Sequence, residues 1–321
     1  MKIGIPKALM FYYYYPFWKC FFEELGHEVV TTDDTNINLI TEGINATVSE
    51  LCVPIKIFNG HVIELLKKDV DLVFIPQFYS MKSEWYCPKF IGITELAEFS
   101  VDNLKDRMLV VTITSKNDVI DKSSDYIKVA DRLGVSAGQI KKALKKAKDV
   151  FNKFRDICKQ GHTAAEAFDI LDGKPVIRAN EKTEIKIGLV GYVYNVYDKY
   201  VSLNAVERLR EMNSEVVTFE MYDENQLLDE NKGKAPFWVY SRKIYNAVKK
   251  MLNDDEIDGI IHLTAFACGP DSVIGKMIEV DCFEQSMPFM TLRIDEHTGE
   301  SHLQTRLEAF TDMLKIKKHK K

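Results

Sequence analysis

The pattern of apolar and polar positions predicts the same succession of elements twice along the chain. An apolar run at residues 2–5 is followed by an aromatic amphipathic stretch and by a second apolar run that ends at Thr31. Residues 186–189, 208–211 and 215–218 repeat this order. A strand, an amphipathic helix and a second strand form the opening unit of a parallel sheet. The chain is therefore expected to contain an internal pseudo-repeat.

Two further runs extend the pseudo-repeat. Residues 71–76 and 258–263 match each other at nearly the offset that separates the two starts. Short, continuous apolar runs are typical of strands covered on both faces. The predicted fold class is α/β, with two doubly wound parallel-sheet lobes that leave a cleft between them.

A helical bridge is expected between the two lobes. Ser136 is placed as the N-cap of a helix whose apolar positions recur at helical spacing as far as Phe154, with lysines on the opposite face. Gly161 is expected to end this helix, and a second helix follows from Thr163 to Leu171. The predicted domains are an N-terminal lobe at 1–130, the bridge at 131–183 and a C-terminal lobe at 184–321.

Composition and charge exclude several classes of protein. The 321 residues are 46% hydrophobic and 28% charged, as in an ordinary globular protein of two domains. The net charge of −5 argues against nucleic-acid binding, and the basic residues 315–321 are interpreted as a solvated terminus. The longest apolar stretch, from Ala8 to Phe22, is interrupted by Pro16 and Lys19, so no membrane span is expected.

The redox compartment decides how the six cysteines are interpreted. Residues 1–6 look like a buried strand rather than a signal peptide, which predicts a cytoplasmic protein with reduced thiols. Six cysteines without close pairs are then not a disulfide framework.

Three of the cysteines share a local context. A proline follows Cys52, Cys87 and Cys268 within two residues. Cys87 and Cys268 also come after the matched strands, and ligands of parallel sheets bind beyond the carboxyl ends of the strands. Converging thiolates would select zinc or an iron–sulfur cluster. The alternative is that each cysteine is a small buried hydrophobe.

Other residues have both a chemical and a structural interpretation. His61 is either a fourth metal ligand or a histidine whose hydrogen bonds are satisfied in the core. Glu296, His297 and Glu300 follow a strand and could move protons, or they could form an acidic helix N-terminus. Cys20 is assigned to core packing, Cys158 to the bridge, and Cys282 is a remote candidate for a further ligand.

Some catalytic motifs do not occur in the sequence. There is no Walker-type phosphate loop, no Gly-x-Gly-x-x-Gly after a strand and no Gly-x-Ser-x-Gly elbow. Chemistry driven by a nucleotide or by an acyl-serine is therefore unsupported.

The motifs taken together resemble a known family. They are residues 3–9 leading into 12–16, then 52–56, 87–90, 267–272, 295–300 and 305–310, in this order. The chain resembles, over nearly its whole length, the domain of unknown function in acyl-CoA dehydratase activase-related proteins. That domain is similar to the cluster-bearing subunits of 2-hydroxyacyl-CoA dehydratases and benzoyl-CoA reductases.

The resemblance implies a low-potential 4Fe–4S cluster held by Cys52, Cys87 and Cys268. In the dehydratase relatives the remaining iron is open and two such subunits pair, so a homodimer is expected. A related branch carries a double-cubane cluster, which is the alternative nuclearity. The activase relatives hydrolyse ATP in a separate actin-like domain, so electrons would come from an ATP-dependent activase or another donor.

The resulting hypothesis is an iron–sulfur protein of the dehydratase or reductase type, with its cluster in the cleft. One alternative is a non-catalytic cluster carrier or electron-transfer partner of an activase. A second is a zinc-stabilised binding protein in which His61 completes the ligand set. A third is a metal-free, two-lobed protein that binds a small molecule.

Overall fold

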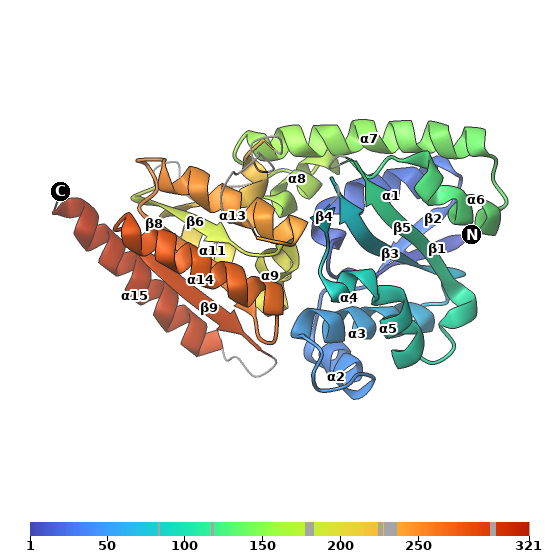
Figure 1. The fold of residues 1–321 in the computed structure, drawn as a ribbon, viewed down its shortest axis with the longest axis horizontal. Coiled ribbons are helices and arrows are strands. Elements are labelled where there is room, and N and C mark those ends of the chain that lie inside the picture. The colour runs from blue at the N-terminus through green and yellow to red at the C-terminus, as the bar shows by residue number, and fades with distance from the viewer. Residues whose placement is uncertain are drawn as a thin grey trace. The chain divides into compact units, whose positions relative to one another are not determined.

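The computed structural model describes residues 1–82, 84–116, 119–176, 183–223, 227, 236–295 and 300–320, without the side chains of Glu300 and His302. This part of the chain forms two compact units, Met1–Phe154 and Arg155–Lys321. Each unit is built on its own sheet with helices packed against it (Figure 1).

In the part of the chain that the structure describes, the first unit contains five strands and seven α-helices, and the last of these helices continues beyond Phe154 into the second unit. Its strands are β1 (Lys2–Ile5), β2 (Glu28–Thr31), β3 (Leu72–Met81), β4 (Glu84–Trp85) and β5 (Met108–Ser115). Its helices are α1 (Phe11–Glu24), α2 (Ile37–Asn45), α3 (Val53–Lys67), α4 (Pro88–Ile91), α5 (Ile93–Ser100), α6 (Ile127–Leu133) and most of α7 (Ala137–Lys159).

The second unit has its own set of strands and helices. Its strands are β6 (Ile185–Val190), β7 (Ser214–Val217), β8 (Gly259–Ala265) and β9 (Phe289–Ile294). Its helices are α8 (Ala164–Leu171), α9 (Val193–Tyr197), α10 (Lys199–Ser202), α11 (Ala205–Glu211), α13 (Val239–Leu252), α14 (Gly269–Glu284) and α15 (Glu300–His319).

The two sheets have the same strand order. Parallel strands run β2-β1-β3-β5 in the first unit and β7-β6-β8-β9 in the second. The short β4 adds to the end of β3 as an antiparallel strand. The first strand of each unit therefore lies inside its sheet, and the predicted α/β fold with two doubly wound, repeated lobes is confirmed.

Helices cover both faces of the first sheet. Gly4 on β1 faces Leu65 of α3, so α3 lies on the face toward which Gly4 points. On the opposite face, Trp18 and Phe22 of α1 pack against Phe74 of β3, with ring centroids 5.1 and 4.9 Å apart. Aromatic pairs at this spacing contribute about 0.5–1.5 kcal/mol beyond their buried area.

The second sheet is covered in the same way. Gly188 on β6 faces Met251 of α13, whereas Gly259 on β8 faces Phe310 and Leu314 of α15. Because Gly188 pairs with the residue that follows Gly259, the two glycines point to opposite faces of the sheet. Helices α13 and α15 therefore cover different faces.

The predicted bridge helices are present, and Ser136 caps the first of them as expected. The Ser136 hydroxyl accepts from the backbone N–H of Gln139 at 3.3 Å, and the Gln139 side chain accepts in return from the Ser136 N–H at 2.9 Å. Gly161, with φ of +88°, follows the end of α7. Thr163 and Glu166 form a complete capping box at the start of α8. Local sequence thus determines where both helices begin.

The boundary between the two compact units falls inside α7, which continues from Phe154 into Arg155. Helices α7 and α8 occupy most of the predicted bridge at 131–183. The division into two lobes and a separate bridge stays a prediction.

Strand β3 is longer than its apolar pattern indicates. The matched run ends at Pro76, but the strand continues to Met81. Pairing with β1 is limited to Leu72 and Val73, while β5 pairs with β3 along most of its length. Between Phe74 and Phe78 the strand is paired with β5 alone, and a proline without an N–H group is tolerated at such an edge position.

A helix that crosses a membrane must be both long and apolar. None of the helices in the described ranges combines enough length with enough apolar character to cross a bilayer.

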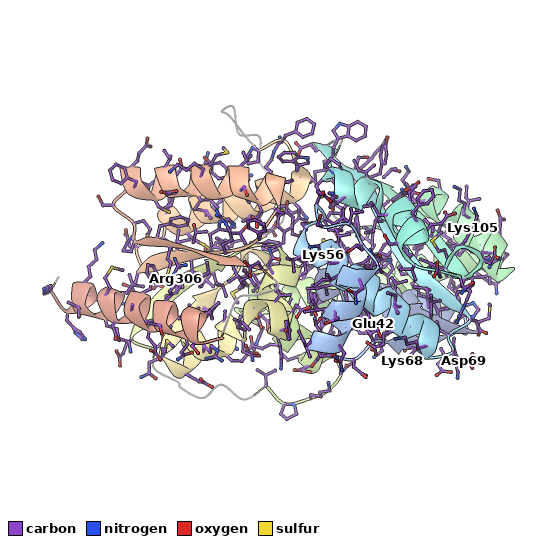
Figure 2. The ribbon with its side chains drawn as sticks, turned by 90° about the horizontal axis from the view of Figure 1, so that it is seen from below. Glu42, Lys56, Lys68, Asp69, Lys105 and Arg306 are labelled. Carbon is purple, nitrogen blue, oxygen red and sulfur yellow. The ribbon has the colours of Figure 1, made fainter. Side chains whose placement is uncertain are left out.

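Helices α2 and α3 cross in backbone contact. A Cβ atom on Gly43 would lie 1.9 Å from the carbonyl oxygen of Lys56, and one on Gly60 would lie 2.2 Å from that of Leu39. Glu42, labelled with Lys56 in Figure 2, forms an ion pair with Lys67 at 2.5 Å beside this crossing. Only glycine permits so close an approach, and the crossing determines the position of α3.

Gly43→Ala is expected to destabilise the protein by roughly 1–3 kcal/mol, because the new methyl group overlaps a backbone oxygen. The control is Gly138→Ala in the exposed first turn of α7, where a Cβ meets only the Ser136 hydroxyl at 3.8 Å. This control should be neutral or stabilising by up to about 1 kcal/mol. Thermal unfolding of both variants measures the difference, and equal midpoints would contradict the close crossing.

A buried carboxyl group gives the second unit a pH-dependent stability. Glu220 is 1% exposed and accepts a hydrogen bond from the Tyr197 hydroxyl, while Arg155 donates to its backbone carbonyl at 2.6 Å. Burial raises the pKa of Glu220 from 4.5 to about 7, and Arg155 opposes this shift. The folded chain therefore binds the Glu220 proton more tightly than the unfolded chain.

We expect Glu220 to reduce stability as the pH rises from about 4.5 to about 7, because the folded pKa lies above the unfolded one. The effect is roughly 3 kcal/mol at full ionisation. Glu220→Gln should remove this part of the pH dependence. At pH values above 7, its thermal midpoint should lie above that of the wild type. The exposed Glu211→Gln serves as the control and should keep the wild-type profile; identical profiles for all three proteins would contradict the assignment.

Candidate metal centre on three helix N-caps

The three predicted ligands share one structural position. Cys52, Cys87 and Cys268 are the N-cap residues of α3, α4 and α14, and each of these helices has a proline in its first two positions. Proline suits these positions because the first N–H groups of a helix have no acceptor within it, so proline loses no hydrogen bond there. Each thiol therefore lies just outside a helix, at the end where backbone N–H groups are available.

Cys52 and Cys87 lie within electrostatic reach of each other in the first unit. Burial raises the pKa of the Cys87 thiol to about 11, and a negative charge on Cys52 raises it further. The nearby backbone N–H groups of Phe90 and Lys89 favour the anion and oppose this rise. Burial also raises the pKa of the Cys52 thiol, and the nearby backbone N–H group of Ile55 opposes this rise.

Two cations accompany this pair of thiols. The positive charges of Lys89 and Lys56 both lower the pKa of Cys52. Lys56 is only 6% exposed, although it belongs to the first turn of α3. Neither lysine was predicted to act on the thiols, because a lysine beside a cysteine in the sequence is usually solvated. A cation buried beside Cys52 favours the anionic form of that thiol.

Cys268 belongs to the second unit. It is half-buried, and the Ser272 hydroxyl donates to its carbonyl oxygen at 2.8 Å, which closes the first turn of α14. Within the described ranges, no three His, Cys, Asp or Glu side chains are grouped so as to hold a metal ion. The convergence of all three cysteines stays a prediction.

His61 lies in the core with both ring nitrogens occupied. Its Nδ1 and Nε2 atoms are 2.5 and 2.9 Å from the hydroxyls of Thr32 and Thr35. Burial lowers the pKa of His61 to about 3, and the charge of Lys7 lowers it further. This environment agrees with the interpretation of His61 as a satisfied core histidine rather than a fourth ligand.

The candidates for proton transfer cannot be placed. Glu296 and His297 lie outside the described residues, and Glu300 begins α15 with a side chain that is not described. Their roles stay predictions.

The remaining cysteines lie in helices. Cys158 and Cys282 are fully buried, and Cys20 is half-buried in α1. Burial raises the pKa of Cys282 to about 12. No disulfide joins any of the six cysteines, all of which are in the described ranges.

Two family models match the chain and overlap in its middle. The CoA enzyme activase uncharacterised domain matches residues 2–222, and the 2-hydroxyglutaryl-CoA dehydratase D-component matches residues 145–314. The chain belongs to these two families. The resemblance drawn from the motifs is thereby confirmed, and the chain is related to a dehydratase-type component. Cys52 and Cys87 lie within the activase-related match, and Cys268 lies within the dehydratase match.

Other comparisons add little. No curated protein matches the sequence. Among solved structures, tagatose-6-phosphate ketose/aldose isomerase from Escherichia coli is similar over 99% of this chain and 82% of that chain, with 11% identity and a TM-score of 0.21.

Proposed function

We propose that the chain is an iron–sulfur protein of the dehydratase type, with a 4Fe–4S cluster held by Cys52, Cys87 and Cys268. The observation that carries this proposal is the shared N-cap position of the three thiols in a member of the dehydratase D-component family. When bound, the cluster would supply a low-potential electron for reductive or electron-transfer chemistry. A double-cubane cluster is the alternative nuclearity.

The residues around the thiols suit such a cluster. Thiolates select soft metals and iron–sulfur clusters over hard cations. The backbone N–H groups of Ile55, Lys89 and Phe90 favour the anionic form of the two sulfurs of the first unit. Lys56 and Lys89 offset the negative charge that thiolate ligands bring. Hydrogen bonds to sulfur and nearby charge are the two means by which a protein adjusts the potential of a cluster.

The zinc alternative is less well supported. A structural zinc site needs four ligands, and His61 was the fourth in that hypothesis. Both nitrogens of His61 contact threonine hydroxyls instead.

The proposed electron donor is an ATP-dependent activase. The family that matches residues 2–222 is described as a CoA enzyme activase domain, and the sequence itself has no Walker-type phosphate loop. A homodimer and a cytoplasmic location complete the proposal.

Protein purified without oxygen should absorb broadly near roughly 400 nm and contain about four iron and four sulfide per chain. Replacing Cys52, Cys87 or Cys268 by serine should remove most of both signals, because each variant loses one thiolate ligand. Cys20→Ser is the matched control, since Cys20 lies within α1, and it should keep the cluster. A colourless wild type without iron after anaerobic reconstitution would refute the proposal, whereas about eight iron would indicate the double cubane.

Lys56→Gln should shift the reduction potential of the cluster to more negative values by on the order of tens of millivolts, because a positive charge stabilises the reduced, more anionic cluster. Lys68→Gln is the control on the same helix. Lys68 is the C-cap residue of α3, roughly 20 Å from the Cys52 end by helix rise, and is labelled in Figure 2. Protein-film voltammetry of both variants measures the shift. Equal potentials in the two variants would show that Lys56 does not act on the cluster.

A further inference from the structure

A groove runs beside α14 in the second unit, over the last strand of the sheet. Strand β9 pairs only with β8 in the described structure, and α14 packs against both strands. Phe289, Thr291 and Arg293 occupy alternate positions of β9, so they share one face of it. The cavity has a volume of about 710 Å³ and is lined by this face and by α14. This volume lies within the roughly 300–1,000 Å³ of small-molecule pockets.

The inner wall of the groove carries three buried polar side chains. His262 and Thr264 lie on β8, and Asp271 lies in the first turn of α14. His262 Nε2 and Asp271 Oδ1 are 2.8 Å apart, and neither side chain is more than 1% exposed. His262 Nδ1, Asp271 Oδ2 and the Thr264 hydroxyl have no hydrogen-bond partner within the described residues.

These three atoms point to a ligand. A buried polar atom without a partner costs about 1–3 kcal/mol, and native proteins contain few of them. Here three occur on neighbouring residues, and all three residues line the same cavity. If Asp271 holds the proton of His262 on Nε2, Nδ1 is left as an acceptor. The groove therefore offers both donor and acceptor groups to a bound molecule.

The rim of the groove favours an anion. Lys276 pairs with Glu279 at 3.0 Å, and Arg306 (Figure 2) donates to the carbonyl oxygen of Thr291 at 2.9 Å. Arg293 is exposed and has no charged partner among the described side chains that line the groove. An arginine can bind a carboxylate or a phosphate through two parallel hydrogen bonds.

Apolar side chains complete the wall. Phe283 is 85% exposed on α14, and Met287, Phe289 and Met290 lie nearby along the groove. The groove thus combines an apolar wall with several polar and charged side chains, and such a lining can hold a small organic molecule that has both an apolar body and polar groups.

We propose that this groove binds a small organic anion. Its carboxylate or phosphate would pair with Arg293, and a hydroxyl or carbonyl group of the same molecule would reach His262, Asp271 and Thr264. The apolar body would lie against Phe289 and its neighbours. The site lies within the second unit and does not depend on the iron–sulfur cluster.

The Thr264→Val variant gives a test in which stability and binding change in opposite directions. Valine has nearly the shape of threonine, and it replaces the Thr264 hydroxyl, which has no partner within the described residues, by a methyl group. The variant should raise the thermal midpoint of the unliganded full chain and weaken binding roughly fivefold. Thr311→Val is the control, because the equally buried Thr311 hydroxyl donates to the Glu308 carbonyl at 2.9 Å. The control should lose stability and keep its affinity.

Titration calorimetry of the full chain with lactate, glycerol 3-phosphate and adenosine monophosphate would identify the anionic group. Lactate offers a carboxylate, and the other two offer a phosphate with a small or an aromatic body. Arg293→Ser should weaken binding of any probe that binds roughly tenfold or more. Lys128→Ser removes one exposed positive charge from α6 and should leave the affinity unchanged.

Binding of lactate alone would assign a carboxylate ligand, and binding of either phosphate compound would assign a phosphate ligand. Both results support the site if Arg293→Ser and Thr264→Val weaken the affinity. Absence of saturable binding at millimolar concentration of all three probes would overturn the proposal. Equal affinities in the wild type and the two groove variants would overturn it as well.

Discussion

Each candidate thiolate belongs to the N-cap residue of a helix, and a proline in the first two helical positions stabilises that arrangement. Proline in the first turn starts α3, α4 and α14 without losing a backbone hydrogen bond. The cysteine is left extended, with φ and ψ near −65° and 150° at Cys52 and Cys87. At Cys52 and Cys87, backbone N–H groups of the same helix favour the anionic form of the sulfur. The position of α3, and with it Cys52, depends in turn on the contact between Gly43 and the Lys56 backbone.

Much of the fold could be predicted because it is encoded locally. The matched apolar runs around Ile3 and Ile187 became the inner strands β1 and β6. Ser136 caps the helix it was expected to cap, and the second helix begins at Thr163 as predicted. Strand β3 was predicted too short, since its continuation beyond Pro76 depends on pairing with β5. Pairing between distant segments leaves little trace in the local pattern.

The site was predicted less completely than the fold. The proline context singled out the three cysteines, but the burial of Lys56 beside Cys52 depends on how α3 packs. The partners of His61 are threonines from another segment, which spacing cannot reveal. His262 and Asp271 also meet only in three dimensions, although a histidine and a threonine at alternate positions of an apolar strand are a recognisable signal. Helix α14 thus carries both Cys268 and one side of the groove.

The central claim is that Cys52, Cys87 and Cys268 hold one cluster. The most direct test is a crystal structure of protein purified and crystallised without oxygen, with anomalous diffraction measured at the iron edge. The account predicts a single compact group of iron peaks bonded to the sulfur atoms of these three cysteines. Iron bound to other residues, or a site that contains zinc instead of iron, would contradict it.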